Sequence, residues 1–199
     1  MILKDKDIRE PLFEFLEGEY GLIRIIEEKQ TGRARADVVM VLNGALCGIE
    51  IKSDADTYAR LKKQVKYYNR YYDFNYAVCG STHAAHIEEH VPSFWGIITV
   101  DEVNGKPDFY IKRRPLPNPK MKMECKITLL WRPELSAIQE KYHLPAYKQK
   151  SKQFVQKKLM EKLDIQDLHA EISNALFERD YTLIEDQLNE YRAAARRKK

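Results

Sequence analysis

The chain has 199 residues, of which 44% are hydrophobic and 32% charged, and its formal net charge is +4. A chain of this length forms one domain of ordinary size, alone or with a small appendage, and the composition is that of a soluble globular protein. Charged residues begin at Lys4, which excludes the apolar run of a signal peptide or a membrane span. We therefore expect a cytoplasmic protein without a membrane partner, whose cysteines are buried free thiols: Cys47, Cys79 and Cys125.

The first 114 residues alternate helical and strand patterns, as in an α/β domain. An amphipathic helix precedes a strand, and two apolar runs on either side of Asn43–Gly44 predict a hairpin, because this dipeptide is a strong turn signal. Cap residues then precede a helix with a basic outer face. A fourth strand, a short helix, a fifth strand and a second hairpin at Asn104–Gly105 follow. The expected ranges are about 7–16 and 57–72 for the long helices, 83–90 for the short one, and 22–28, 76–79 and 94–100 for the strands outside the hairpins.

The register of the first hairpin brings like charges together. Counting outward from the two-residue turn at Asn43–Gly44 places Asp37 opposite Glu50 and Arg35 opposite Lys52. Like charges in such cross-strand pairs destabilise a sheet, and the flanking residues are apolar on both faces, as in a buried central strand. One interpretation is a cation-binding site between the two carboxylates, with Lys52 beside it. The alternative is an ordinary cross-strand ion-pair cluster with Arg35.

Asp37, followed thirteen residues later by Glu50-x-Lys52 on the next strand, resembles the signature of the PD-(D/E)xK nuclease superfamily. The resemblance covers roughly residues 5–100, although the proline that precedes the aspartate in the superfamily is Ala36 here. Gln64-x-x-x-Tyr68 on the following helix is similar to an element of RecB-like and lambda-exonuclease-like members. Three segments further resemble an uncharacterised bacterial and phage branch of the superfamily: residues 33–73, 95–98 and 130–134.

This resemblance implies a restriction-endonuclease-like fold, in which helices flank a central mixed sheet of about four to five strands. It also implies that Asp37, Glu50 and the Ile51 carbonyl bind Mg²⁺ or Mn²⁺, hard cations that prefer oxygen ligands. Lys52 would orient the attacking water and stabilise charge on the transition state. The implied function is a Mg²⁺-dependent deoxyribonuclease, and the residue pattern does not distinguish DNA from RNA.

Further roles follow from the same resemblance. Gln64 would position the nucleophile or Lys52, and Tyr68 would support it or contact DNA; the alternative for both residues is simple packing of the helix on the sheet. Many members add an upstream glutamate, for which we prefer Glu28 over Glu27. The basic outer face of the helix is either a DNA-binding surface or merely solvated. The candidate contacts to nucleic acid are Arg33, Arg35 and Lys63.

Three prolines, at positions 115, 117 and 119, predict a linker over residues 115–126. It would separate a nuclease-like core, residues 1–114, from a helical appendage, residues 127–199, that binds DNA or protein. Lysine and arginine nearly balance aspartate and glutamate before residue 115 and exceed them after it, which favours a polyanion partner for the C-terminal part. The alternative function is therefore a non-cleaving DNA-binding or protein-recruitment module on a nuclease fold.

One metal motif points elsewhere. His86, Glu89 and His90 match the His-x-x-Glu-His pattern of zinc proteases. Pro92 ends the predicted helix almost at once, and no later helix offers a clear third ligand. We interpret this segment as a polar helix without zinc.

Overall fold

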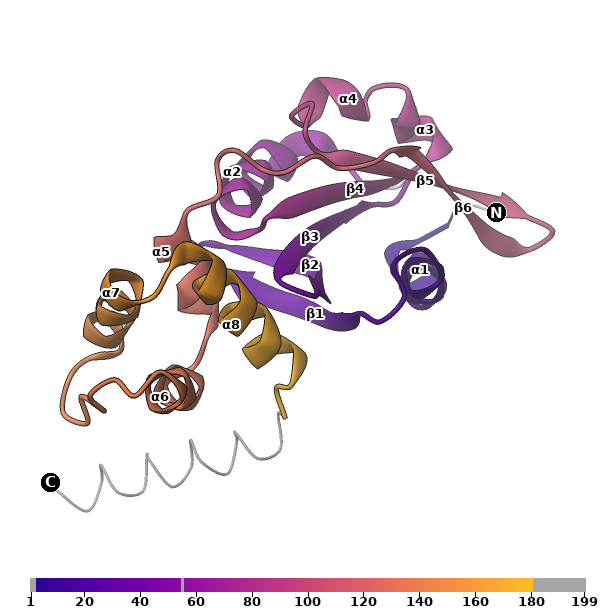
Figure 1. Ribbon diagram of the computed structural model, residues 1–199. Helices are drawn as coiled ribbons and strands as arrows, with labels where there is room; N and C mark the ends of the chain where they lie inside the picture. The colour runs from indigo at the N-terminus through magenta and orange to yellow at the C-terminus, as the bar shows by residue number, and fades with distance from the viewer. Residues whose placement is uncertain (1–2, 55, 181–199) are drawn as a thin grey trace, which may run out of the picture.

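A six-stranded mixed sheet forms the centre of the computed structural model (Figure 1), which describes residues 3–54 and 56–180. The strands follow chain order across the sheet. The β3–β4 and β4–β5 pairs are parallel, and the other pairs are antiparallel. The strands are β1 (Arg24–Thr31), β2 (Ala34–Leu42), β3 (Ala45–Lys52), β4 (Phe74–Gly80), β5 (Gly96–Val103) and β6 (Lys106–Arg113). The helices are α1 (Asp5–Tyr20), η1 (Tyr58–Arg60), α2 (Leu61–Tyr71), α3 (Ser81–Ala84), α4 (Ile87–His90), α5 (Met123–Lys126), η2 (Ile127–Leu129), α6 (Arg132–Lys141), α7 (Lys152–Lys162) and α8 (Ile165–Phe177).

The predicted class, an α/β core with a mixed sheet flanked by helices and followed by C-terminal helices, is confirmed. The sheet has six strands rather than four or five, because both arms of the second hairpin belong to it and β6 forms an edge. The cysteines of the chain are buried and free, as expected. No helix within the described residues is long and apolar enough to cross a membrane. The last part of the predicted helical appendage, residues 181–199, lies outside the described part of the chain.

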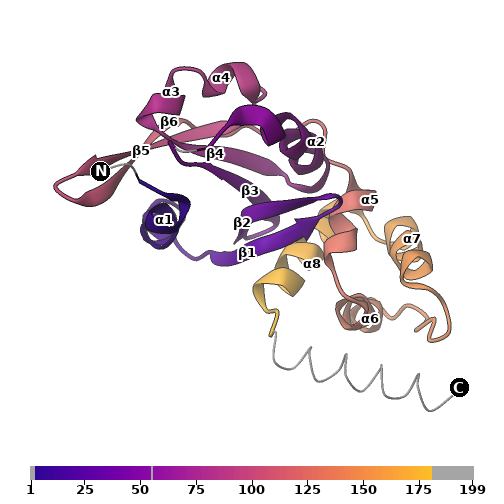
Figure 2. The ribbon, with the colours of Figure 1, turned by 180° about the vertical axis from the view of Figure 1, so that it is seen from behind.

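Different helices cover the two faces of the sheet (Figures 1 and 2). Val38 and Met40 of β2 pack in a cluster with the buried face of α1. Val39 and Val41 pack in a second cluster with α2 and the C-terminal helices. Because side chains alternate between the faces of a strand, a strand buried on both sides becomes a continuous apolar run. This explains the unbroken apolar sequence of β2.

Gly48 of β3 determines how closely α2 approaches the sheet. A Cβ atom at this position would lie 2.7 Å from Cδ1 of Tyr68 and closer still to the ring of Tyr72, nearer than any real Cβ contact. Both tyrosines are buried: Tyr68 lies in α2, and Tyr72 directly follows its last residue. A residue without a side chain is therefore needed where these two rings lie against β3.

The first hairpin has the predicted register, but its ladder is shorter than expected. Pairing runs from Leu42 opposite Ala45 to Val38 opposite Ile49 and then stops, so the expected pairs Asp37–Glu50 and Arg35–Lys52 do not form. The Asp37 carboxylate instead accepts a hydrogen bond from the Ile51 amide, with Oδ2 2.9 Å from the nitrogen. A side chain thus replaces the backbone ladder here, and the end of β3 separates from β2.

Arg35 and Lys52 consequently have different neighbours. Arg35 pairs with Gln30 in β1, and its exposed side chain forms an ion pair with Glu28. Lys52 pairs with Cys79 in β4 and is almost fully buried. Of the alternative ion-pair cluster, the Lys52–Glu50 pair forms, whereas Arg35 is paired with Glu28 instead.

The segment predicted as a linker is hydrogen-bonded to the core. The side-chain amide of Asn118, which is buried, donates to the carbonyls of Asn69 at 3.0 Å and Tyr72 at 2.7 Å. At the end of this segment, Nζ of Lys126 lies 2.6 Å from Oδ2 of Asp73, which precedes β4. Apolar residues of α6, α7 and α8 then share one core with β2 and α2. The C-terminal helices are thereby packed onto the same sheet face as α2.

Candidate active site

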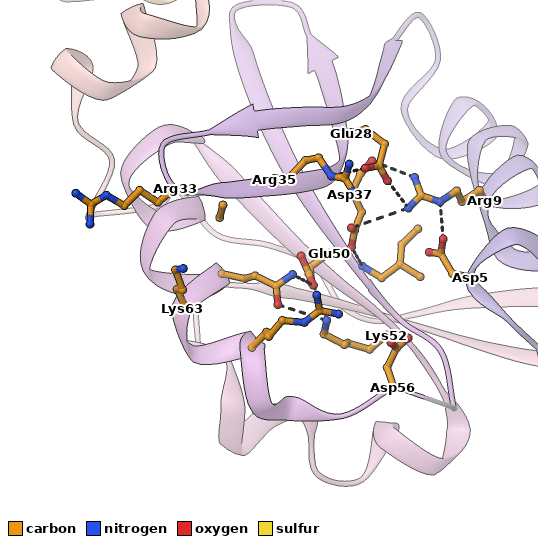
Figure 3. Close-up of a pocket in the computed structure, with 14 residues that line it drawn as sticks. Asp5, Arg9, Glu28, Arg33, Arg35, Asp37, Glu50, Lys52, Asp56 and Lys63 are labelled. Atoms are coloured by element: carbon orange, nitrogen blue, oxygen red, sulfur yellow. Dashed lines mark hydrogen bonds and ion pairs between the residues drawn. The ribbon is translucent and has the colours of Figure 1, made fainter.

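A cavity of about 500 Å³ opens where β2 and β3 separate (Figure 3). It lies between the ends of those strands, the start of α2 and one side of α1. Nearly all of the predicted site residues line it, although they come from four separate elements. Those residues are Glu28, Arg33, Arg35, Asp37, Glu50, Ile51, Lys52, Lys63 and Gln64.

Glu50 is the most enclosed group of the site, with no exposed surface. Its Oε1 accepts hydrogen bonds from Nζ of Lys52 at 2.6 Å and from the side-chain amide of Gln64. Its Oε2 accepts one from the hydroxyl of Tyr68 at 2.8 Å. A buried carboxylate is costly unless it is paired and hydrogen-bonded, and this network supplies both kinds of partner. Lys52 and Gln64 are also linked, with Nζ 3.4 Å from Oε1.

Asp37 lies across the cavity from this network. Its pKa is raised from 3.8 to about 7, firstly by burial and secondly by the charge of Glu50. The Ile51 amide, Lys52 and Arg9 oppose this rise without cancelling it. A carboxyl group held among other carboxylates favours either a proton or a cation. The two carboxylates predicted to share a cation therefore do influence each other, although they are not a cross-strand pair.

Tyr68 supports the site from behind. It is fully buried, and its hydroxyl accepts a hydrogen bond from the Asp37 amide at 3.1 Å while donating to Glu50. Burial first, and the charges of Glu50 and Asp37 next, keep its pKa well above the usual value, so the phenol retains its proton. Of its two predicted roles, contact with DNA is wrong for a residue so enclosed, and support of the carboxylates fits its position.

Nearly the whole chain matches one known protein family. A model built for the bacteriophage P4 protein cII matches residues 3–198. The chain belongs to the bacteriophage P4 cII family. The phage part of the sequence resemblance is thus confirmed. No curated protein matches this cII-family chain. Among solved structures, SfsA of Pyrococcus furiosus in complex with Ca²⁺ is similar at 14% identity and a TM-score of 0.31; the match covers 59% of this chain and 62% of that one, less than two thirds of its length.

Glu28 and Arg9 close one side of the cavity in the cII-family protein (Figure 3). Glu28 adopts a φ of 52°, a left-handed conformation that is unusual for glutamate, and the β1–β2 ladder skips it. Its carboxylate forms ion pairs with Arg35 and with Nη2 of Arg9, the latter at 2.9 Å. Glu27 also contacts Arg9, at 3.3 Å, but does not line the cavity. The positions therefore favour Glu28 over Glu27 as the upstream carboxylate.

Four charged residues of the cavity wall were not predicted from the sequence. Arg9 is the most connected of them: it donates to the Asp37 carbonyl at 3.2 Å and to Asp5 at 2.7 Å, besides its bonds to the glutamates of β1. The helical pattern of α1 places Arg9 on a polar face, but nothing in the sequence says which polar residues meet β1. The other three are Asp5, Asp56 and Arg60.

The cations that line the cavity surround the carboxylates of Asp37 and Glu50. Lys52 alone pairs with Glu50, whereas Lys63 has no ion pair within the described residues. Figure 3 shows that Arg33 extends away from Asp37 and Glu50, toward the outside. This placement suits contacts to the backbone of a bound polyanion better than contacts to the carboxylates.

The histidine motif forms no metal site in the described residues. His86 contacts Glu89 at 3.2 Å, and the ring of His90 packs on Tyr58 with centroids 4.0 Å apart. Within residues 3–54 and 56–180 no three His, Cys, Asp or Glu side chains converge closely enough to hold a metal ion.

Asp37→Asn should stabilise the metal-free protein at alkaline pH. Because the folded-state pKa is raised, the folded protein binds this proton more tightly, so stability is lost as pH rises from 3.8 to about 7. Asparagine removes the charge and keeps an oxygen for the Ile51 amide. In EDTA at pH 8 we expect a gain on the order of 1–3 kcal/mol, vanishing near pH 4. Urea unfolding at both pH values measures it; Glu14→Gln on the exposed face of α1 is the control, and an equal gain at both pH values contradicts the prediction.

Proposed function

We propose that this cII-family protein is a metal-dependent nuclease of the PD-(D/E)xK type that hydrolyses phosphodiester bonds in DNA. The observation that carries the proposal is the convergence of Asp37, Glu50 and Lys52 on one cavity, with Gln64 bonded to two of them. These residues come from β2, β3 and α2 and are up to 27 positions apart in the sequence. Chance acidic clusters rarely combine burial, a raised carboxyl pKa and an adjacent lysine.

The donor set suits a hard divalent cation. Asp37, Glu50 and the Ile51 carbonyl offer only oxygen atoms, which Mg²⁺ and Mn²⁺ prefer. Asp37, whose pKa is raised to about 7, would lose its proton on binding a cation. When bound, such an ion polarises a phosphoryl oxygen and lowers the pKa of a water molecule.

The protein's own residues would do the positioning. Lys52 is almost fully buried and fixed by Glu50, so its ammonium group is pre-organised toward the cavity. A fixed cation in a poorly hydrated site stabilises negative charge that develops on a phosphate better than a mobile surface lysine does. Gln64 holds both Lys52 and Glu50, and would keep the lysine from moving onto Asp37.

Cleavage assays test the proposal directly. Linear, circular and single-stranded DNA are incubated with the full chain in Mg²⁺, Mn²⁺ or EDTA, and we expect cutting in both metals and none in EDTA. The double variant Asp37→Asn, Glu50→Gln should lose both cleavage and Mn²⁺ binding by calorimetry, because its ligand oxygens carry no charge. Cleavage that continues in this variant would falsify the assignment of the site.

A second candidate is a DNA-binding module without turnover. The observation that favours it is the complete set of partners around Glu50, since Lys52, Gln64 and Tyr68 satisfy both of its oxygens without any metal. In that case calorimetry detects no Mn²⁺ binding, while DNA still binds to the protein. The same titration therefore separates the two candidates.

A further inference from the structure

A second groove, of about 510 Å³, lies on the other side of α2 from the cavity. Its walls are the outer face of α2 and the segment that leads into α5, which pass beside each other in both ribbon views (Figures 1 and 2). The amide of Lys122 donates to the carbonyl of Arg70 at 3.0 Å and fixes the two walls together. The groove therefore lies between a helix of the predicted core and the segment that was predicted as a linker.

The charge of this groove is of one sign. Five exposed cations line it and no acidic residue does. None of the five forms an ion pair with any residue in the described part of the chain, whereas many other exposed cations do. Like charges four residues apart on a helix destabilise it, so this arrangement has a cost without an internal compensation. The five cations are Lys62, Lys66, Arg70, Lys120 and Lys122.

The spacing matches a nucleic-acid strand. Lys62, Lys66 and Arg70 follow one another every fourth residue and so form a stripe along α2. Eight residues of helix span ~12 Å, over which one strand of B-form DNA carries about three to four phosphates. The opposite wall adds Lys120, whose Nζ lies 6.0 Å from the centroid of Phe94.

The groove is also next to the cavity. Lys62 lines the groove, while Lys63 and Gln64, the next two residues of α2, line the cavity. The first turn of α2 is thus a ridge between them. We propose that the groove binds the sugar-phosphate backbone of DNA and leads one strand across this ridge to the carboxylates. The proposal rests on the proposed nuclease function for its direction, but the binding itself does not require cleavage.

The test compares two triple variants that remove the same charge. Lys62→Gln, Lys66→Gln, Arg70→Gln changes the groove; Lys6→Gln, Lys106→Gln, Lys148→Gln changes exposed cations elsewhere. Binding of fluorescent DNA is followed by anisotropy in EDTA at several salt concentrations. In the groove variant the slope of log K against log[salt] should fall by about 3, and in the control by less than 1. Equal losses in both variants, or unchanged DNA binding in the groove variant, would overturn the proposal.

Two further measurements separate the groove from the active site. Hydrolysis of bis(p-nitrophenyl) phosphate in Mn²⁺, a diester small enough to need only the cavity, should be the same in the groove variant and the wild type. If no protein hydrolyses it, the groove is judged by anisotropy alone, and the nuclease proposal is judged by the DNA cleavage assay. An acidic peptide or an anionic vesicle that loses binding in the groove variant, when DNA does not, would assign the groove to another partner and overturn the proposal.

Discussion

Replacing Lys52 by glutamine is expected to lower kcat/KM for DNA cleavage by about 10²–10³-fold, the usual effect of removing one fixed group that stabilises transition-state charge. Glutamine can still donate a hydrogen bond to Glu50, so the buried carboxylate keeps its three partners. Mn²⁺ binding should change little, because the lysine is not a ligand. The loss should fall on kcat more than on KM, since Lys52 lies beneath the rim where DNA would first bind.

Three controls make this result specific. Lys106→Gln removes the same charge from the exposed start of β6 and should leave cleavage unchanged. Thermal unfolding of Lys52→Gln excludes a folding defect as the cause. Lys52→Arg restores the charge but not the shape of the ammonium group, so it should recover only part of the rate. Full activity of Lys52→Gln would show that the lysine serves only to neutralise Glu50.

Asp73→Ala is expected to cause the largest loss of stability, about 3–5 kcal/mol, because it leaves Lys126 buried without its counter-ion. The Lys126 side chain has no exposed surface, and its Nζ contacts Asp73 Oδ2 at 2.6 Å and Nδ1 of His169 at 2.7 Å. Asp73 also accepts a hydrogen bond from the Leu46 amide at 2.7 Å. The ion pair therefore joins the start of β3 and β4 to the helix that begins the C-terminal region.

Thermal unfolding measures this effect, which for a chain of this size corresponds to a Tm lower by roughly 6–20 °C. The double variant Asp73→Asn, Lys126→Met removes both charges and should recover most of the stability. Glu88→Ala breaks the exposed ion pair with Lys112 and should leave the Tm unchanged. If Asp73→Ala unfolds at the same temperature as Glu88→Ala, the buried pair contributes no net stability.

Local signals are enough to predict the hairpin and the helix face that carries Gln64 and Tyr68. Asn43–Gly44 with its apolar flanks predicts the register, because a two-residue turn allows only one pairing, and Gly44 indeed has a φ of 76°. The four-residue spacing of Gln64 and Tyr68 likewise predicts that both lie on one helix face, and both side chains hydrogen-bond to Glu50. These predictions succeed because each depends on residues close together in the chain.

The rest of the site depends on how distant elements meet. Arg9 reaches the Asp37 carbonyl only because α1 packs on the face of the sheet that carries Val38 and Met40, which no local pattern encodes. The left-handed φ of Glu28 is equally hidden, since glutamate gives no signal for it. The early end of the β2–β3 ladder comes from a competition between the side chain of Asp37 and the backbone for the Ile51 amide. Such competitions are settled by tertiary structure.

Gly48 shows how the geometry of the candidate site depends on a residue outside the cavity wall. The residue does not border the cavity, yet the missing side chain lets Tyr68 and Tyr72 lie directly on β3. The distance between α2 and β3 determines whether Gln64 and Tyr68 can hydrogen-bond to Glu50. A single methyl group at position 48 would push α2 away from β3 and so lengthen both hydrogen bonds to Glu50. Selection for the chemistry of this site would therefore also keep residue 48 a glycine, although this residue does not line the cavity.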